Sequence, residues 1–454
     1  MSGEVFYLYS KEAFMIELRK KLFTLTDRVN YRILIANLIK WIILGSIIGV
    51  VVGAIASLFL NVLQIATNTR INYQWLIFFL PLGGAIVSFL YTKYGKVSLQ
   101  GNNLILDQIH EGDREIPLRM APLVFIGTII THLLGGSAGR LGAVLQIGGS
   151  IAEHLGEFFK LDKVDRRLML MCGISSAFGS VFGTPLAGTI FGMEVISIGR
   201  LEYGALIPCF VASFSGSLVS SVLGTKYPHY IIRNIPQVSI LTIIKVIIAS
   251  ILFAVISIIF TESIHACKRL FSRLFKSRIV RSIMGGLIII ILTLIIGRRD
   301  YLGLGTSVIA DSFEKIDSAT NFFWKIVFTS ITLGSGFQSG EVTPAFFVGS
   351  TFGNTLGGIM NLSPSFLAAL GLVSVFCGAT NTLITSFFLG LELFQGQAII
   401  YMFICCVVSY FFSGDHGIYT SQKIYCPKCN ILEIHNNVET GFAKINEEKI
   451  YENQ

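Results

Sequence analysis

A glutamate and a threonine stand two positions apart, as Glu341 and Thr343, in a stretch at 334–350 that is rich in glycine and apolar residues. An ionisable residue in apolar sequence is costly inside a membrane, and by default it marks a pathway for an ion or a substrate. Pro344 directly after Thr343 is typical of the first turn of a helix, where free backbone N–H groups attract anions. The stretch therefore predicts an anion site at a helix start.

Both residues also have a purely structural interpretation. A carboxylate at a helix start is stabilised by the helix dipole, so Glu341 is a candidate for that role as well as for the ion pathway. Threonine is a common N-cap because its hydroxyl accepts a hydrogen bond from the first turn. We favour the pathway role for Glu341 and leave both roles open for Thr343.

A related glycine-rich stretch occupies residues 135–150 in the first half of the chain. Residues 173–194 can be laid over 371–392 without a gap, and at that offset identical residues pair as Gly173/Gly371, Ser176/Ser374, Phe178/Phe376, Thr184/Thr382, Gly192/Gly390 and Glu194/Glu392. The same offset places Gly142 on Gly340. Repeated halves with short or interrupted segments are typical of transporters whose substrate site lies between the repeats. Because Glu194 and Glu392 recur symmetrically, we expect them to be scaffold residues that cap neighbouring helices.

The amino-acid composition indicates that these elements lie in a membrane. Of 454 residues 53% are apolar and only 14% are charged, which excludes an ordinary soluble protein. Apolar stretches recur along the chain, so we predict an all-α polytopic membrane protein. The expected segments lie near 33–67, 75–93, 118–134, 143–158, 168–197, 202–223, 238–265, 282–297, 322–334, 343–360, 366–394 and 397–412, with a half-length helix opening after residue 98.

The formal net charge of +8 does not indicate nucleic-acid binding, because the basic residues gather between apolar segments. One predicted loop carries Lys160, Lys163, Arg166 and Arg167, and another carries Lys268, Arg269, Arg273, Lys276, Arg278 and Arg281. The positive-inside rule places both loops on the cytoplasmic side of the cell membrane. We expect both termini on the same side.

The expected organisation has four parts. Residues 1–30 form a cytosolic amphipathic helix, residues 31–225 and 226–420 form the two membrane halves, and residues 421–454 form a cytosolic tail. The tail contains Cys426-Pro-Lys-Cys429, which is half of a zinc-ribbon pattern. A structural zinc site needs four ligands, so we expect a reduced pair of thiols, no metal and no cofactor.

These motifs together resemble the chloride channel and transporter (CLC) family over residues 33–420. Residues 135–142, Gly-Gly-Ser-Ala-Gly-Arg-Leu-Gly, resemble the family motif G-x-x-x-G-R-E-G, and Thr184-Pro-Leu-Ala-Gly188 resembles its A-P-L-A-G core. The run Gly340-Glu-Val-Thr-Pro344 is similar to the version found in the fluoride-transporting branch. The resemblance implies a dimer of subunits built from two inverted-topology halves, with many tilted, short or broken helices.

The resemblance also implies which residues line the anion pathway: Asn102, Gly139, Arg140, Glu341, Val342, Thr343 and Tyr419. In the turn at 100–103 Asn102 is the expected pore-facing residue and Gln100 is the alternative, where chloride-transporting members carry a serine. Arg140 either attracts anions near the mouth or anchors its loop through a carboxylate. Val195 stands where chloride/proton exchangers keep an inner glutamate, which the fluoride branch also lacks.

The gate position departs from the family pattern. The glutamate of G-R-E-G, which couples anion to proton movement in the family, is Leu141 here. Leucine cannot titrate and cannot mimic an anion, so coupling is expected to be lost or altered. The residue is explained either by a natural member without the carboxylate or by a Glu→Leu substitution.

The resemblance therefore implies fluoride export through a fluoride/proton antiporter scaffold, with resistance to fluoride as the benefit to the cell. Chloride or another anion moving through the same fold is the alternative, and protons are a second candidate ion. Fluoride holds its water tightly, so a selective site needs close donors such as helix-start N–H groups, hydroxyls and an amide. No nucleophile–base pair or phosphate-binding loop accompanies Glu341, so we do not expect an enzyme.

Overall fold

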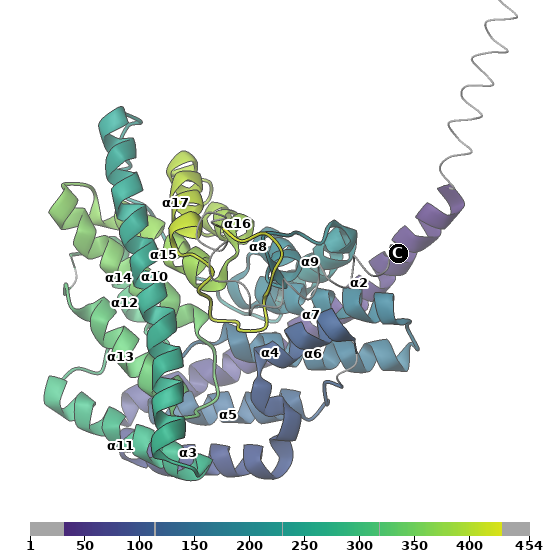
Figure 1. The fold of residues 1–454 in the computed structure, drawn as a ribbon, viewed down its shortest axis with the longest axis horizontal. Coiled ribbons are helices and arrows are strands. Elements are labelled where there is room, and N and C mark those ends of the chain that lie inside the picture. The colour runs from purple at the N-terminus through teal and green to yellow at the C-terminus, as the bar shows by residue number, and fades with distance from the viewer. Residues whose placement is uncertain (1–30, 113–114, 229, 317, 429–454) are drawn as a thin grey trace, which may run out of the picture.

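The computed structural model describes residues 31–112, 115–228, 230–316 and 318–428. The described chain is folded almost entirely into helices that pack around one another, and α10 is the long helix standing upright in the view of Figure 1. The predicted amphipathic helix at 11–30, residue Cys429 and the end of the predicted tail lie outside the described residues.

The helices before residue 225 follow the predicted segments closely. They are α2 (Tyr31–Asn72), α3 (Leu80–Leu90), α4 (Asn102–Glu111), α5 (Met120–Leu134), α6 (Leu141–Phe158), α7 (Lys163–Phe182), α8 (Pro185–Glu194) and α9 (Leu206–Val222). The segment expected at 75–93 is not one helix. It is divided into η1 (Gln74–Phe79), α3, the π-helical turn η2 (Tyr91–Gly95) and η3 (Lys96–Gln100), with a short turn η4 (Tyr203–Ala205) before α9. Pro81 lies in the first turn of α3, a position that suits proline because the N–H it lacks has no partner there.

The second half differs from the prediction in several places. Its helices are α10 (Ile240–Leu274), α11 (Arg278–Ile296), α12 (Thr306–Glu314), α13 (Asn321–Gly334), α14 (Val342–Met360), α15 (Pro364–Thr380), α16 (Leu383–Leu393) and α17 (Ile399–Phe412). The short helix α12 was not expected. The single segment predicted at 366–394 is wrong, because Asn381 adopts a left-handed conformation with φ of 58° and ends α15. Asparagine tolerates this C-terminal conformation better than most residues.

Five helical segments are long and apolar enough to cross a membrane, as far as the described residues go. They are Tyr31–Asn72, Gln74–Gln100, Tyr203–Val222, Ile240–Leu274 and Arg278–Ile296. They carry many exposed apolar side chains, such as Ile33, Leu218 and Ile295, which suits contact with lipid. Shorter apolar helices, including α5, α15, α16 and α17, pack among them.

Glycines let the central helices approach closely. A Cβ atom on Gly173 of α7 would meet the carbonyl oxygen of Gly148 on α6, and a Cβ on Gly371 of α15 would meet that of Gly349 on α14. Small residues at such contacts are a general device for packing helices in membranes. Gly173 and Gly371 are the first matched pair of the sequence repeat, and both make this type of contact.

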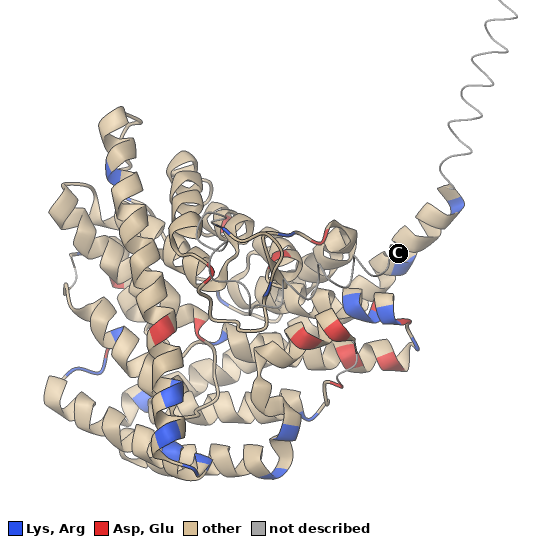
Figure 2. Ribbon diagram, in the orientation of Figure 1, with Lys and Arg blue, Asp and Glu red and all other residues tan. Residues whose placement is uncertain are grey.

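The basic residues predicted in loops lie mostly on helix ends. The α10–α11 connection is only 275–277, since α10 runs to Leu274 and α11 begins at Arg278. Lys268 and Arg273 are therefore helical. Figure 2 shows Lys and Arg concentrated where α10 ends and α11 begins, and again around the α6–α7 connection.

The described beginning of the predicted tail packs against the helical body. Strand β2 (Lys423–Ile424) pairs in parallel with β1 (Ser197–Ile198), which follows α8. Lys428 donates from Nζ to Asn381 Oδ1 at 2.5 Å and to Ser413 Oγ at 3.0 Å. Residues 421–428 are thus tied to both halves of the chain.

Candidate functional site

The two glycine-rich stretches meet in the structure. The Gly139 N–H donates to the Gly340 carbonyl oxygen at 2.6 Å, and the Gly340 N–H donates back to the Gly139 carbonyl oxygen at 3.1 Å. This isolated antiparallel bridge joins residues that are far apart in the sequence. It places the start of α6 beside the start of α14.

Only glycine permits so close a contact. A Cβ atom on Gly139 would lie 2.9 Å from both the Gly340 carbonyl oxygen and Pro344 Cδ. A Cβ on Gly340 would lie 2.5 Å from the backbone nitrogen of Gly142. Both distances are shorter than non-bonded atoms tolerate, so a side chain at either position would push the two loops apart.

Each glycine-rich stretch contains the start of a helix. Leu141 is the first residue of α6 and follows Arg140, while Val342 is the first residue of α14 and follows Glu341. Neither Arg140 nor Glu341 caps its helix through its side chain. Thr343 is the second residue of α14, so the alternative that Thr343 is the N-cap is wrong. The first-turn N–H groups of two helices lie near one point, and helix starts carry partial positive charge.

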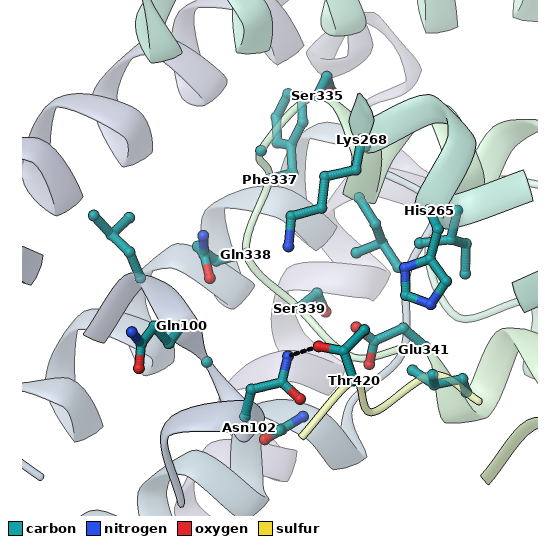
Figure 3. A pocket seen from close by; sticks show the side chains of 18 of the residues that line it. Gln100, Asn102, His265, Lys268, Ser335, Phe337, Gln338, Ser339, Glu341 and Thr420 are labelled. Carbon is teal, nitrogen blue, oxygen red and sulfur yellow. Dashed lines mark hydrogen bonds between the residues drawn. The ribbon is translucent and has the colours of Figure 1, made fainter. Parts of the chain in front are cut away.

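A cavity of about 240 Å³ lies beside the bridge. Its walls come from residues 99–103, the glycine stretch at 334–339, α10 and residues 418–420, as Figure 3 shows. Three residues expected to line the anion pathway, Asn102, Glu341 and Tyr419, line this cavity, and so does the alternative Gln100. The other expected pathway residues and the gate position, Gly139, Arg140, Leu141, Val342 and Thr343, are not among its lining residues.

Asn102 and Glu341 converge on Gly142. The point where a Cβ of Gly142 would lie is 3.1 Å from Asn102 Nδ2 and 3.5 Å from Glu341 Oε2. Asn102 is the first residue of α4 and is held there by the glycine before it, Gly101, whose φ is 61°. An amide donor and a carboxyl oxygen thus face the same side of the α6 start.

Four of the expected pathway residues have a buried polar atom without a partner. Asn102 Oδ1, Glu341 Oε2, Thr343 Oγ1 and the Tyr419 hydroxyl are buried and have no hydrogen-bond partner among the described residues. Buried polar atoms in folded proteins are nearly always satisfied, so each exception needs an explanation. The hydroxyls of Thr343 and Tyr419 can donate to an anion, whereas Asn102 Oδ1 and an ionised Glu341 Oε2 only accept, so water or a protonated carboxyl group is the partner that suits these two oxygens.

Asn102 and Tyr419 stand between two spaces. A second, much smaller cavity of about 10 Å³ is lined by both of them together with Val195 and apolar side chains of α4, α6, α7 and α8. Val195 is buried and its side chain offers no proton-carrying group at this wall. The two polar side chains therefore lie between a large cavity with mixed polar and apolar walls and a small apolar one.

Arg140 is directed elsewhere. Its guanidinium carbon lies 5.8 Å from the centre of the Phe182 ring, and its buried Nε atom has no hydrogen-bond partner among the described residues. Among the described residues it forms no ion pair. The alternative in which a carboxylate anchors the Arg140 loop therefore finds no support in this part of the chain.

Leu141 is fully buried and belongs to the hydrophobic core. Val342 is also fully buried, so its contribution to the site is its backbone N–H at the start of α14. The gate position thus holds an apolar side chain packed inside the protein, next to the bridge.

The prediction that Glu194 and Glu392 cap neighbouring helices is confirmed. Glu194, the last residue of α8, accepts hydrogen bonds from Ile384 N at 2.9 Å and Thr385 N at 2.8 Å at the start of α16. Glu392, near the end of α16, accepts from Leu186 N and Ala187 N, both at 2.9 Å, at the start of α8. Each helix therefore caps the other.

Two contributors were not expected from the sequence. His132 Nε2 lies 3.2 Å from Ser339 Oγ and 3.4 Å from the Gly139 carbonyl oxygen, so it braces both glycine stretches. Asn103 donates to Thr420 Oγ1 at 2.9 Å and accepts from Ser421 N at 3.2 Å, which fixes Tyr419 relative to α4. Neither residue belongs to a motif with a recognisable spacing. The contact of His132 with Ser339 and the contacts of Asn103 with Thr420 and Ser421 span 200 or more positions.

Comparison with known proteins supports the resemblance drawn from the motifs. Residues 83–414 match the model of the voltage gated chloride channel family. The chain is 39% identical over 397 residues to a chloride/fluoride channel protein of Pseudomonas syringae pv. tomato, covering 86% of this chain and 88% of that protein. It is 22% identical over 434 residues to an H(+)/Cl(-) exchange transporter of Vibrio cholerae, covering 85% of this chain and 88% of the relative.

Solved structures agree on the fold. The crystal structure of a CLC-type fluoride/proton antiporter superposes with a TM-score of 0.83 and 35% identity, covering 85% of this chain and 98% of that one. A slow cyanobacterial Cl-/H+ antiporter gives a TM-score of 0.70 at 21% identity, covering 83% of this chain and 93% of the other, a likeness of fold alone. The family match and the apolar helices make this a multi-pass membrane protein. The chain belongs to the voltage gated chloride channel (CLC) family.

Proposed function

We propose that this protein carries fluoride out of the cell through the site between the two glycine stretches. The observation on which the proposal rests is the convergence of unpartnered buried polar atoms from Asn102, Glu341 and Tyr419 on one cavity beside two helix starts. The similarity to a chloride/fluoride channel protein and to a fluoride/proton antiporter supports the choice of ion.

Fluoride suits this donor set for a physical reason. A small anion gives up a tightly held hydration shell only when short, directed donors replace it. The Tyr419 hydroxyl, the Asn102 amide and the first-turn N–H groups of α6 and α14 are such donors. Chloride is larger, and we propose that it is the poorer substrate.

Proton movement, where it occurs, depends on Glu341. When this carboxyl group is ionised it repels an anion in the cavity, and when it is protonated its hydroxyl donates a hydrogen bond to that anion. Among the described residues that line the cavity, Glu341 is the only carboxylic acid. Since Leu141 supplies no second titratable group, we propose passive or weakly proton-coupled transport rather than tight exchange.

The remaining assignments complete the proposal. The protein acts in the cell membrane as a homodimer with one pathway per subunit, with both termini and the α10–α11 connection on the cytoplasmic side. Its role is transport without an enzymatic reaction, without a cofactor and without a resident metal. Residues 31–225 and 226–420 act as its two halves.

Ion flux from liposomes tests the substrate. Purified protein should release trapped fluoride several times faster than trapped chloride, measured with ion-selective electrodes after a potassium ionophore removes the membrane potential. Protein-free liposomes set the background. Faster release of chloride would support the alternative of a chloride transporter on the same fold, and release of neither ion would refute transport of both.

A further inference from the structure

Part of the wall of the large cavity is basic. Lys268, Arg278 and Arg281 line it, whereas Glu341, the one carboxyl group among the described residues that line the cavity, lies beside the bridge. Lys268 and Arg278 are exposed, so this wall reaches the molecular surface. An anion approaching the cavity from that side therefore meets positive charge before it meets Glu341.

Arg281 and Lys268 differ in their hydrogen-bond partners. Arg281 donates from Nε to the Phe275 carbonyl oxygen at 2.6 Å, which caps the end of α10 and explains the residue structurally. In the described part of the chain, Lys268 takes part in no ion pair and no side-chain hydrogen bond. Figure 3 shows its side chain leaving α10 and pointing into the cavity, toward Gln338 and Ser339.

A glycine places Lys268 at this point. A Cβ atom on Gly334 would lie 2.6 Å from Cys267 Cβ and 3.0 Å from the backbone nitrogen of Lys268. The backbone of α10 therefore lies directly against the start of the glycine stretch that leads to Glu341. A larger residue at 334 would push α10, and with it the ammonium group, away from the cavity.

We propose that Lys268 is the capture residue for fluoride, a binding group outside the selective site that receives the hydrated anion and passes it to Asn102 and Tyr419. The inference rests on the proposed function and adds a step to it. A cavity of about 240 Å³ has room for on the order of ten waters, so the anion keeps most of its hydration there. A lysine ammonium on a flexible stem suits this task, because it is a compact charge that is itself strongly hydrated.

Fluoride dependence of the initial flux tests the proposal in liposomes at low ionic strength. Replacing Lys268 with glutamine should raise the fluoride concentration for half-maximal flux by about three- to tenfold, the effect of one unit charge a few ångströms away in water. The maximal flux should stay the same, since the selective site is unchanged. Lys268→Arg should behave as the parent, and added potassium gluconate should shrink the difference because salt screens exposed charges.

Lys276→Gln is the matched control. Lys276 is exposed, lies eight positions further along the same basic region and does not line the cavity. If this variant raised the half-maximal concentration as much as Lys268→Gln, a general surface potential would explain the result and the capture site would be refuted. A fall in maximal flux with an unchanged half-maximal concentration in Lys268→Gln would refute it too, and would indicate that Lys268 serves Glu341 as a counter-charge.

The same measurement separates the two proposals. If the parent protein moves no fluoride, the proposed function fails before Lys268 is considered. If the parent moves fluoride and Lys268→Gln has the half-maximal concentration of the parent, only the capture step fails. Arg278→Gln, which removes a second exposed cation of this wall, should give a smaller shift in the same direction.

Discussion

At the scale of single residues, Glu341 combines burial, an unpartnered oxygen and access to a cavity. Its Oε2 atom has no hydrogen-bond partner among the described residues, and it lies near Asn102 at the start of α6. A glutamate with only a structural role at a helix start would bond to the first-turn N–H groups, yet Glu341 does not cap α14 in this way. These observations favour a role in which the carboxyl group changes its charge during transport.

Replacing Glu341 with glutamine tests that role. The parent should move fluoride faster as the pH falls, because protonation removes a negative charge from the anion path. Glutamine imitates the protonated form, so the variant should show a flux that is nearly constant with pH. Fluoride flux and internal pH are followed together in liposomes, and size-exclusion chromatography controls for folding. A variant with the pH profile of the parent would mean that Glu341 is structural.

Leu141 permits the converse experiment. Leu141→Glu introduces a titratable group at the position beside the bridge, so fluoride movement down its gradient should begin to drive protons in the opposite direction. A pH-sensitive dye inside the liposomes measures this movement. Leu141→Gln is the control, since it is also polar but cannot titrate. If both variants move protons equally, the assignment of residue 141 as the gate is wrong.

At the scale of elements, α8 and α16 are joined by an exchange of carboxylates. Glu194 satisfies the first N–H groups of α16, and Glu392 satisfies those of α8. Charge-assisted hydrogen bonds at helix starts are among the stronger polar contacts. This pair secures the ends of two short helices that could not hold their position by length alone.

Glutamine at Glu194 or Glu392 should lower thermal stability in detergent. Each single variant should lose about 2 kcal/mol, since an amide replaces one acceptor oxygen with a group that faces N–H donors. The two losses should not add, because each helix carries the cap of the other. Circular dichroism melts of both single variants and the double variant measure this. Additive losses would mean that the two caps act independently.

The sequence repeat explains why this exchange was predictable. Two glutamates at matching positions in both halves indicate a shared structural task, and both halves use them in the same way. The break between α15 and α16 at Asn381 was not predicted, although the corresponding break in the first half, at Gly183, was. Asparagine is a weaker sign of a helix end than the run Gly-Thr-Pro. The short helix α12 was missed because nine residues give too little periodicity to detect.

The candidate site shows the same division between local and distant signals. Glu341, Thr343 and the glycines were found because their spacing carries chemical meaning within a few residues. Tyr419 and Asn102 came only from resemblance to a family, and His132 and Asn103 were missed. Their roles depend on contacts with residues 200 or more positions away, which no local pattern records.

At the scale of the molecule, residues 421–428 connect the predicted cytosolic tail to the pore. Gln422 Nε2 donates to the carbonyl oxygens of Val195 at 2.8 Å and Thr380 at 2.9 Å. Strand β2 and Lys428 follow directly. Because Tyr419 lies a few residues before these anchors, the segment fixes the position of a residue that lines both cavities.

Two truncations separate this anchor from the rest of the tail. A chain ending at residue 428 keeps the contacts of residues 421–428 and serves as the reference. A chain ending at residue 423 loses Ile424, Tyr425 and Lys428, including two hydrogen bonds from an ammonium group, and should be less stable by about 2–3 kcal/mol. Thermal unfolding in detergent compares them. Equal melting temperatures for the two truncated chains would contradict the anchor.

The bridge between Gly139 and Gly340 restricts how the molecule can alternate between its two sides. Rocking one half against the other would break both hydrogen bonds of the bridge at once, in surroundings where each lost backbone partner costs several kcal/mol. We therefore expect the starts of α6 and α14 to move together at the bridge. A cycle that keeps the bridge intact would work through side-chain rotation and protonation near the bridge, and a cross-link that fixes the starts of α6 and α14 together should leave such a cycle running.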